Sequence, residues 1–256
     1  MEILAGRNAI REALLAGRRR FESVTLAENM PERGPVIDIQ QMCQARGVPL
    51  GQATRRELDQ MADELTHQGM VARVSAYPYA DLDETLANAR STGEDPFLLV
   101  LDELQDPQNV GALLRTAETA GVHGVIIAAQ RAAQITPAVS RASAGAAEHM
   151  RIARVTNIAK TLTTLRDAGL WIAGIEDHPD AQDYRAVDLD RPLALVLGSE
   201  GRGMRPLVAK QCDFLLRIPM RGHINSLNVS AAGAIVIYQA LSARIPRRDA
   251  QAHRER

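Results

Sequence analysis

The sequence predicts an α/β protein in which a parallel sheet covered by helices forms the C-terminal part and a smaller α/β unit precedes it. Three observations lead to this prediction. Short continuous apolar runs recur after residue 97, helical stretches separate several of them, and a polar stretch bounded by Pro and Gly divides this region from the first 76 residues. Continuous apolar runs are typical of strands buried on both faces, and their alternation with helices is typical of a parallel sheet.

The first segment, residues 1–76, mixes short helices and strands. Ile10, Leu14 and Leu15 recur at helical intervals, and Gly47 follows a second helical stretch as a C-cap. The elements expected here are helices at 6–17 and 36–47 and strands at 23–27, 48–52 and 70–74.

Residues 77–94 have the composition of a linker. Pro78 opens the stretch, Gly93 and Pro96 close it, and a short acidic helix fits between them. We therefore expect few contacts between the segments on either side, and we expect a fragment that begins near Ser91 to fold by itself.

The third segment, residues 95–243, carries the regular alternation. Strands are expected at 97–101, 124–129, 170–175, 193–198 and 213–218, and helices at 111–121, 136–148, 157–169, 204–212 and 226–244. Sheets of this kind bind ligands outside the carboxyl ends of their strands. The remaining residues, 244–256, form a basic tail, which is either a solvated end or an RNA-binding arm.

Composition excludes several classes of protein. The chain has 256 residues, 46% of them hydrophobic and 24% charged, which excludes a wholly disordered or collagen-like chain. It has no apolar run of transmembrane length and no secretory h-region at its start, and its 2 cysteines, Cys43 and Cys212, lie in no metal-binding or redox spacing. We expect a protein of the reducing cytoplasm, with no membrane contact and with buried, inert thiols.

The basic residues are almost all arginine. Lys160 and Lys210 are the only lysines among 30 basic residues, and the net charge is −1. Arginine binds phosphate bidentately and stacks on bases, which suits a nucleic-acid partner. Codon bias in a GC-rich genome produces the same replacement, so composition leaves the two explanations open.

Three loops that follow predicted strands carry more polar residues than a sheet needs. In the first, LDELQDPQNVGALLRTAE, Asp106 and Pro107 break the strand, Asn109 can cap the next helix, and Arg115 lies near its beginning. By itself this loop is equally consistent with a helix cap followed by a surface arginine.

The second loop, LVLGSEGRGMRP, places Gly198, Gly201 and Gly203 directly after a buried strand. Backbone amides of such a loop can face a ligand. Glu200 lies among them and repels phosphate, so a neutral or cationic ligand fits better than a nucleotide phosphate. A glycine-rich turn without function is the alternative.

The third loop, RIPMRGHINSLNVSAAGA, brings Ser226, Asn228 and Ser230 to the start of an apolar helix. Helix capping explains one of these polar residues but not all three together with Asn225.

Taken together and in this order, NVGALLRTAE, LGSEGRGM and IPMRGHINSLNVSAA resemble the three motifs of the SpoU (TrmH-like) family of RNA ribose 2′-O-methyltransferases. The resemblance covers about residues 97–243. GRNAIREAL and HQGMVARV in the first segment resemble recurrent phrases of the family's RNA-binding substrate domain. They are most similar to the subgroup that methylates a guanosine ribose in 23S ribosomal RNA.

This resemblance implies a trefoil knot in the C-terminal domain, a homodimer, and S-adenosylmethionine as methyl donor. Periodicity shows none of these, and chains are in general unknotted. By position, the resemblance places the cofactor against the backbone of Gly198, Ile218 and Leu227. It places the catalytic positions at Asn109, Arg115, Glu200, Ser226 and Asn228.

A ribose hydroxyl needs in-line positioning and stabilisation of the developing alkoxide before it attacks a sulfonium methyl. An arginine pKa above about 12 makes Arg115 a poor base, so we expect it to bind the target phosphate and lower the pKa of the hydroxyl. Asn109, Ser226 and Asn228 would fix ribose and arginine by hydrogen bonds, and Glu200 would orient Arg115 or a loop. No metal is expected, because the six histidines show no metal-binding spacing.

Three points stay open on the sequence. The acidic stretch Glu176-Asp177-His178-Pro179-Asp180 is expected to be a solvated loop, and His67 either touches RNA or closes a turn. Two alternatives remain for the function: the target is transfer RNA instead of ribosomal RNA, or the chain binds RNA without modifying it. A nicotinamide-dependent reductase is consistent with the alternation of strands and helices. Such an enzyme needs a GxGxxG motif after the first strand of the sheet, and this motif is absent.

Overall fold

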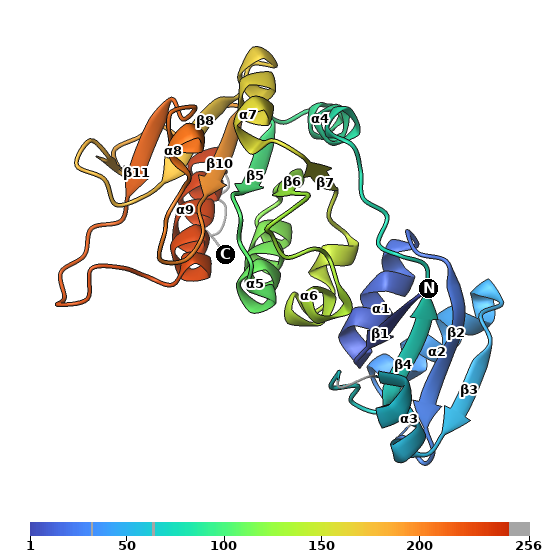
Figure 1. Cartoon of the computed structure of the whole chain (residues 1–256). Coiled ribbons are helices and arrows are strands. Elements are labelled where there is room, and N and C mark those ends of the chain that lie inside the picture. The colour runs from blue at the N-terminus through green and yellow to red at the C-terminus, as the bar shows by residue number, and fades with distance from the viewer. Residues whose placement is uncertain (32, 63–64, 246–256) are drawn as a thin grey trace, which may run out of the picture.

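The chain folds around two separate sheets, as the computed structural model of residues 1–31, 33–62 and 65–245 shows (Figure 1). Most of the predicted basic tail, residues 246–256, lies outside these described residues. The smaller sheet belongs to the N-terminal segment and the larger one to the C-terminal segment, and the two lie at opposite ends of the molecule.

The N-terminal sheet has the strand order β1-β4-β2-β3. Its strands are β1 (Glu2–Ala5), β2 (Phe21–Ala27), β3 (Leu50–Ala53) and β4 (Met70–Val74), and its helices are α1 (Arg7–Ala16), α2 (Pro35–Arg46) and α3 (Arg55–Ala62). Strand β4 pairs antiparallel with β1 and β2, whereas β2 and β3 are parallel. Apolar residues of α1 and α2 pack on one face, and a smaller cluster with α3 packs on the other.

Most of the elements predicted in this segment are confirmed. Gly47 ends α2 in the left-handed conformation, with φ of 65°, as expected of a C-cap glycine. The sequence prediction missed β1 and α3. His67 closes a turn: its ring is buried, Nδ1 accepts a hydrogen bond from the Gly69 amide at 3.0 Å, and Nε2 lies 2.8 Å from an oxygen of Asp59.

The C-terminal sheet has the strand order β7-β6-β5-β10-β8-β11-β9, and neighbouring strands are parallel. Its strands are β5 (Phe97–Leu101), β6 (Gly124–Ala128), β7 (Ile152–Val155), β8 (Trp171–Ile175), β9 (Gln182–Asp183), β10 (Leu193–Leu197) and β11 (Phe214–Arg217). This confirms the α/β class and the parallel sheet, and the five predicted strands are all present; β7 and β9 were missed.

Helices cover both faces of this sheet. Apolar side chains of α5 (Pro107–Thr119) and α9 (Val229–Arg244) pack on one face, with α6 (Pro137–Ala142) beside α5. The opposite face is covered by α4 (Leu82–Ser91), α7 (Ile158–Asp167) and α8 (Pro206–Ala209). The helix expected at 136–148 is divided into α6 and the short 3-10 helix η1 (Ala146–Glu148), because Gly145 between them has φ of 91°.

The segment predicted as a linker is part of the packed structure, which corrects the expectation of few contacts. Leu86 and Ala89 of α4 are buried on the C-terminal sheet, and Ala80 bridges to Ala153 of β7. A fragment that begins near Ser91 would lose this helix and expose the apolar surface under it. The trefoil knot stays a prediction, since strand order does not describe how the chain threads.

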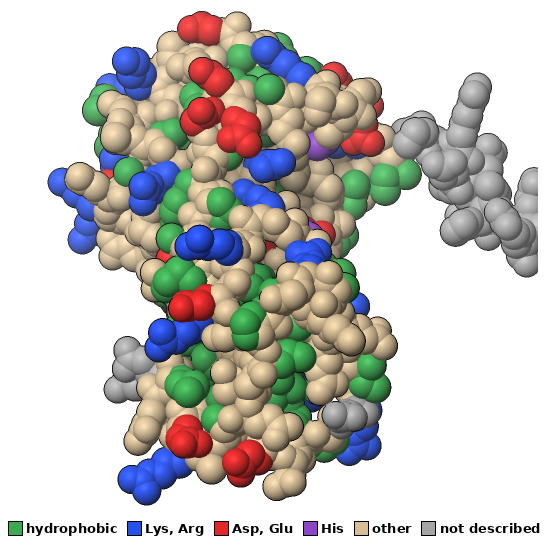
Figure 2. Space-filling view, turned by 90° about the vertical axis from the view of Figure 1, so that its right-hand side faces the viewer, with side chains coloured by type: hydrophobic (Ala, Val, Ile, Leu, Met, Phe, Trp, Pro, Cys, Tyr) green, Lys and Arg blue, Asp and Glu red, His purple; other side chains and the backbone are tan. Residues whose placement is uncertain are grey.

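No helix among the described residues is long and apolar enough to cross a membrane. On the face shown in Figure 2, Lys and Arg side chains gather across the middle of the molecule, where its upper and lower parts meet.

Candidate active site

Two of the candidate loops leave the sheet at the carboxyl ends of neighbouring strands, β5 and β10, and the third follows β11, which β8 separates from β10. Strand β5 lies between β6, the next strand along the chain, and β10, which comes much later in the chain. The register pairs Leu101 with Leu197, so the loops that begin at Asp102 and Gly198 start side by side. This is the position at which open parallel sheets bind ligands.

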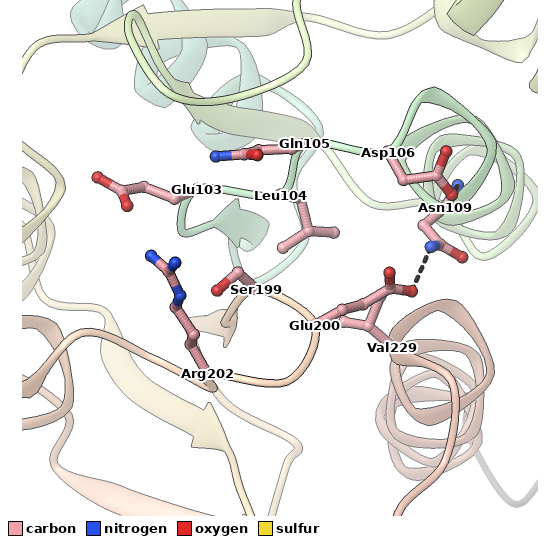
Figure 3. A pocket seen from close by; sticks show the side chains of 9 residues that line it. All are labelled: Glu103, Leu104, Gln105, Asp106, Asn109, Ser199, Glu200, Arg202 and Val229. Carbon is pink, nitrogen blue, oxygen red and sulfur yellow. Dashed lines mark hydrogen bonds between the residues drawn. The ribbon is translucent and has the colours of Figure 1, made fainter.

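Asp106, and not Asn109, caps helix α5. The Asp106 carboxylate accepts hydrogen bonds from the amides of Gln108 at 3.2 Å and Asn109 at 3.1 Å. The prediction of Asn109 as a cap was therefore wrong in this respect. Because Asn109 lies inside the first turn, its side chain is free to point toward the next loop (Figure 3).

The glycine-rich loop folds back on itself. Ser199 and Gly203 exchange two backbone hydrogen bonds of 3.0 Å, and a Cβ at Gly198 would run into the backbone of Gly203 and Met204. Glycine at 198 is thus required by contact within the chain.

An ion pair with a buried carboxylate anchors the far end of this loop. Asp102 has no exposed side-chain surface, and it accepts hydrogen bonds from the Arg205 amide at 3.0 Å and from the Arg205 guanidinium at 2.9 and 2.6 Å. The Asp102 carboxylate raises the pKa of Arg205. The sequence reasoning missed this pair, because its members lie 103 positions apart.

Three amide and carboxylate side chains, one from each loop, meet at the centre of the site. The Asn109 amide donates to Oε1 of Glu200, and the Asn228 amide donates to Asn109 Oδ1 at 2.9 Å and to Glu200 Oε1 at 3.2 Å. Asn228 also caps α9 by accepting from the amides of Ser230 and Ala231. Figure 3 shows Asn109 and Glu200 facing each other from α5 and the glycine-rich loop. We call Asn109, Glu200 and Asn228 the polar triad.

The polar triad lies between two hollows. The larger one, of about 660 Å³, is lined by five predicted site residues besides Asn228: Gly198, Glu200, Ile218, Ser226 and Leu227. The smaller one, of about 340 Å³, is lined by Asn109 and Glu200 together with Glu103, Asp106 and Arg202, among others. In Figure 3, Arg202 and Glu103 lie across this smaller hollow from Asn109.

Arg115 is the one predicted site residue that the structure does not bring to these hollows. It lies in the middle of α5, not near its beginning, and its side chain is exposed. It lines neither hollow in the single chain.

The larger hollow also has an acidic wall that the sequence reasoning assigned to a solvated loop. Glu176 and Asp177 line it, and Glu176 is half-buried. Burial raises the pKa of Glu176, while His178 and the Met204 amide act in the opposite direction. Within the described part of the chain, no group of three or more His, Cys, Asp or Glu side chains is placed to hold a metal ion.

The lining of the larger hollow fits S-adenosylmethionine. Leu197, Ile218 and Leu227 supply apolar surface for a flat base, and exposed loop backbone around Gly201 supplies hydrogen-bonding groups. The carboxylates of Glu176 and Glu200 suit a ligand that carries a positive charge, in agreement with the sequence argument against a phosphate.

Comparison with known proteins identifies the family. Residues 96–238 match the model described as the SpoU rRNA Methylase family, and residues 3–80 match that described as RNA 2′-O ribose methyltransferase substrate binding. The chain belongs to the SpoU family.

Relatives of this SpoU methyltransferase match over nearly the whole chain. A TrmH family tRNA/rRNA methyltransferase of Bacillus subtilis (strain 168) is 41% identical over 96% of this chain and 97% of its own length. One of Staphylococcus aureus (strain MRSA252) is 39% identical over 94% of this chain and 96% of its own length.

Solved structures share the fold. The SpoU methyltransferase AviRb from Streptomyces viridochromogenes, in complex with AdoMet, has a TM-score of 0.77 at 24% identity and covers 95% of this chain and 90% of its own. A structure described as an RNA 2′-O ribose methyltransferase has a TM-score of 0.74 at 25% identity. The match covers 95% of this chain and 88% of the other.

Proposed function

We propose that this SpoU methyltransferase transfers a methyl group from S-adenosylmethionine to the ribose 2′-hydroxyl of a guanosine in 23S ribosomal RNA. The observation that carries the proposal is the polar triad, which joins all three candidate loops between two adjoining hollows. A chain that only binds RNA has no need of such a junction. A ribosomal substrate agrees with the cytoplasmic location that the sequence predicts.

The larger hollow is the proposed cofactor site. Gly198, Ile218 and Leu227 line it with backbone and apolar surface, and Glu176 faces it with a carboxylate. When bound there, S-adenosylmethionine supplies an electrophilic methyl group.

The smaller hollow is the proposed site of the target ribose. Asn109 is buried and its amide is fixed by Glu200, so it can hold a ribose oxygen without first losing conformational freedom. Ser226 and Asn228 approach the same place from the larger hollow. We assign to these residues the positioning of the hydroxyl, and to Glu200 the orientation of both amides. The proton of the hydroxyl leaves to water or to RNA phosphate.

Arg115 acts in this proposal through a homodimer. Its guanidinium is exposed on α5, and apolar surface lies exposed next to it on α9, where Ile235 is 36% and Tyr238 is 46% exposed. The hydroxyl of Tyr238 hydrogen-bonds to Thr119 of α5 at 3.3 Å, so the two helices form one continuous face. Pairing of two copies through this face would cover the apolar residues and bring Arg115 next to the partner's site. There it would bind phosphate and stabilise the developing alkoxide.

Each of the two sheets belongs to a domain with its own proposed function. We propose residues 1–76 as the RNA-binding domain, 77–94 as the connection and 95–243 as the methyltransferase domain. A hollow of about 460 Å³ in the first domain supports this assignment: it is lined by Arg7, Arg33 and Arg55, and none of these forms an ion pair with a described residue. Unpaired arginines in a hollow suit RNA phosphates.

The test is methyl transfer from tritiated S-adenosylmethionine to two probes, a 23S ribosomal RNA transcript and a pool of transfer RNA transcripts, followed by nucleoside analysis. We expect 2′-O-methylguanosine from the ribosomal transcript. Label only in transfer RNA would overturn the ribosomal assignment, and label in a different nucleoside would overturn the guanosine assignment. A third probe, ribosomal particles isolated from a strain that lacks the gene, covers a natural substrate that is a ribosomal assembly intermediate.

A further inference from the structure

A buried ion pair joins the two domains. Nε and Nη2 of Arg19, which precedes β2, donate to the two carboxylate oxygens of Glu148 in η1, at 2.7 and 3.0 Å. The Arg19 side chain is 0% exposed and that of Glu148 is 1% exposed. Arg19 Nη1 also donates to Glu2 at 2.6 Å, and the Ser140 hydroxyl donates to Glu148 at 2.8 Å. Both ends of the pair are therefore held by groups of their own domain.

A second arginine closes the same junction. Arg18 donates to the carbonyl oxygens of Met150 and, at 2.8 Å, of Pro78. Its guanidinium lies 5.4 Å from the ring centroid of Tyr77, and that of Arg19 lies 5.2 Å from it. The Tyr77 hydroxyl in turn donates to the carbonyl oxygens of Ala147 at 3.0 Å and Met150 at 2.8 Å. The connecting segment is thus fixed to both domains and not free between them.

Close packing continues from this junction to the active site. A Cβ at Gly145 would lie 2.6 Å from Cβ of Glu12 on α1, so α1 touches the turn before η1. On the other side of the same α6–η1 unit, a Cβ at Gly111 of α5 would run into Ala142. Gly111 is two residues from Asn109. The N-terminal domain is therefore linked, by close contacts through α6 and η1, to α5, the helix that carries Asn109.

Energetics favour an orienting role for the pair over a stabilising one. The desolvation of two buried charges offsets most of their attraction, so a buried ion pair adds little stability compared with apolar residues. Its bidentate geometry, however, is satisfied in one arrangement only. Two domains joined in this way are held at one orientation.

We infer that Arg19 and Glu148 are positioning residues, which hold the RNA-binding domain at the orientation that presents a bound RNA to the polar triad. The inference rests on the proposed function. Loss of the pair leaves both binding sites intact, but RNA held by the first domain reaches the triad in the productive arrangement less often. The rate of methyl transfer falls while affinity for RNA and cofactor persists, because small misplacement of reacting groups is costly in rate.

The experiment compares wild type with Glu148→Gln, which keeps the shape of the side chain and removes its charge. Domain orientation is measured first, without RNA, as the distribution of distances between spin labels at Glu22→Cys and Asp167→Cys. We expect the native thiols to label slowly, because Cys43 is buried, Cys212 is half-buried, and burial raises the pKa of Cys43 to about 11 and that of Cys212 to about 12. Single-turnover methylation of 23S ribosomal RNA at saturating RNA and cofactor follows, with both affinities determined separately.

We expect Glu148→Gln to broaden the distance distribution and to slow methylation by about tenfold or more, with both affinities within about threefold of wild type. Arg19→Lys keeps the charge without the bidentate geometry and should give a smaller effect in the same direction. The control is Asp38→Asn, which removes an Arg–carboxylate pair (Arg11–Asp38, 3.1 Å) inside the N-terminal domain and should change neither quantity.

Three results would overturn the inference: an unchanged distance distribution in Glu148→Gln, a broadened distribution with wild-type methylation, or a loss of cofactor affinity as large as the loss of rate. The distance measurement needs no RNA. If wild type methylates none of the RNA probes, the proposed function fails, while the orienting role of the pair is still decided by the labels.

Discussion

Replacing Asn109 by leucine is the most direct perturbation of the proposed active site. Leucine has the same branching of side-chain heavy atoms as asparagine and suits a helix, so α5 should persist. Two hydrogen bonds disappear, one donated to the Glu200 carboxylate and one accepted from Asn228. The three loops would then no longer be joined through the polar triad.

The structure allows the effect of Asn109→Leu on the free energy of unfolding to be estimated separately from its effect on the rate of methylation. A hydrogen bond to a charged group contributes about 1.5–3 kcal/mol and a neutral one about 0.5–1.5 kcal/mol. Glu200 and Asn228 are exposed and can bond to water after the change, so the loss should lie near the low end, about 2 kcal/mol. For a chain of this size that corresponds to a fall in Tm of about 4–8 °C. The rate should fall by about 100-fold, as for the removal of one preorganised donor.

Single-turnover methyl transfer, thermal unfolding and calorimetry of S-adenosylmethionine binding measure the three consequences separately. The matched control is Asn88→Leu on α4, which removes an amide hydrogen bond to the carbonyl oxygen of His123 and lies outside the three candidate loops. The control should lose stability without loss of rate at 25 °C. Methylation by Asn109→Leu within threefold of wild type would refute the role of the triad, and so would a loss of cofactor binding as large as the loss of rate.

Three further predictions follow from single side chains. Arg115→Ala should reduce single-turnover methylation at least about 100-fold with unchanged Tm and cofactor affinity, because its side chain is exposed; activity within about threefold of wild type would exclude a catalytic role. Burial raises the pKa of Glu176, so its ionised form is disfavoured in the fold, and the carboxylate should protonate at a higher pH than an ordinary glutamate. S-adenosylmethionine affinity should therefore weaken as the pH falls from 7.5 to 5, and calorimetry should show a flatter profile for Glu176→Gln; identical profiles would contradict a role for this carboxylate. Burial raises the pKa of Cys43 to about 11, so only about one thiol in a thousand is ionised at pH 8, and Cys212, at about 12, is ionised still less. Neither should react with Ellman's reagent in the folded protein within minutes, whereas both should react in guanidinium chloride.

The larger sheet was predictable because its signal is local. Each buried strand reads as a continuous apolar run, and Phe97–Leu101, Gly124–Ala128 and Leu193–Leu197 were recognised on that basis alone. Strand β7 was missed because Ile152–Val155 is short and only its first two residues are buried. Strand β9 has only two residues, too few for any periodicity.

The candidate loops were also predictable, as places where polar residues and glycines exceed the needs of a turn. The roles of individual residues in these loops were harder to predict. Asn109 was taken for a cap because Asn is common there, but Asp106 lies three positions earlier and forms the cap. Gly198 was predicted only to lie beside a cofactor, and its close contact with the backbone of Gly203 and Met204 came from the structure. Local chemistry identifies a polar position but not the group that the position faces.

By itself, then, the sequence determined most of the strands, the order of the three loops and the family that they resemble, because periodicity and turn chemistry act between residues near in the chain. Only the tertiary structure decided which side chains meet. Asn109 reaches Glu200 across 91 positions and Asn228 across 119, and Arg19 reaches Glu148 across 129. Such contacts exist because β5 and β10 pair as neighbours and because α1 packs on the turn at Gly145, and no local pattern encodes either arrangement.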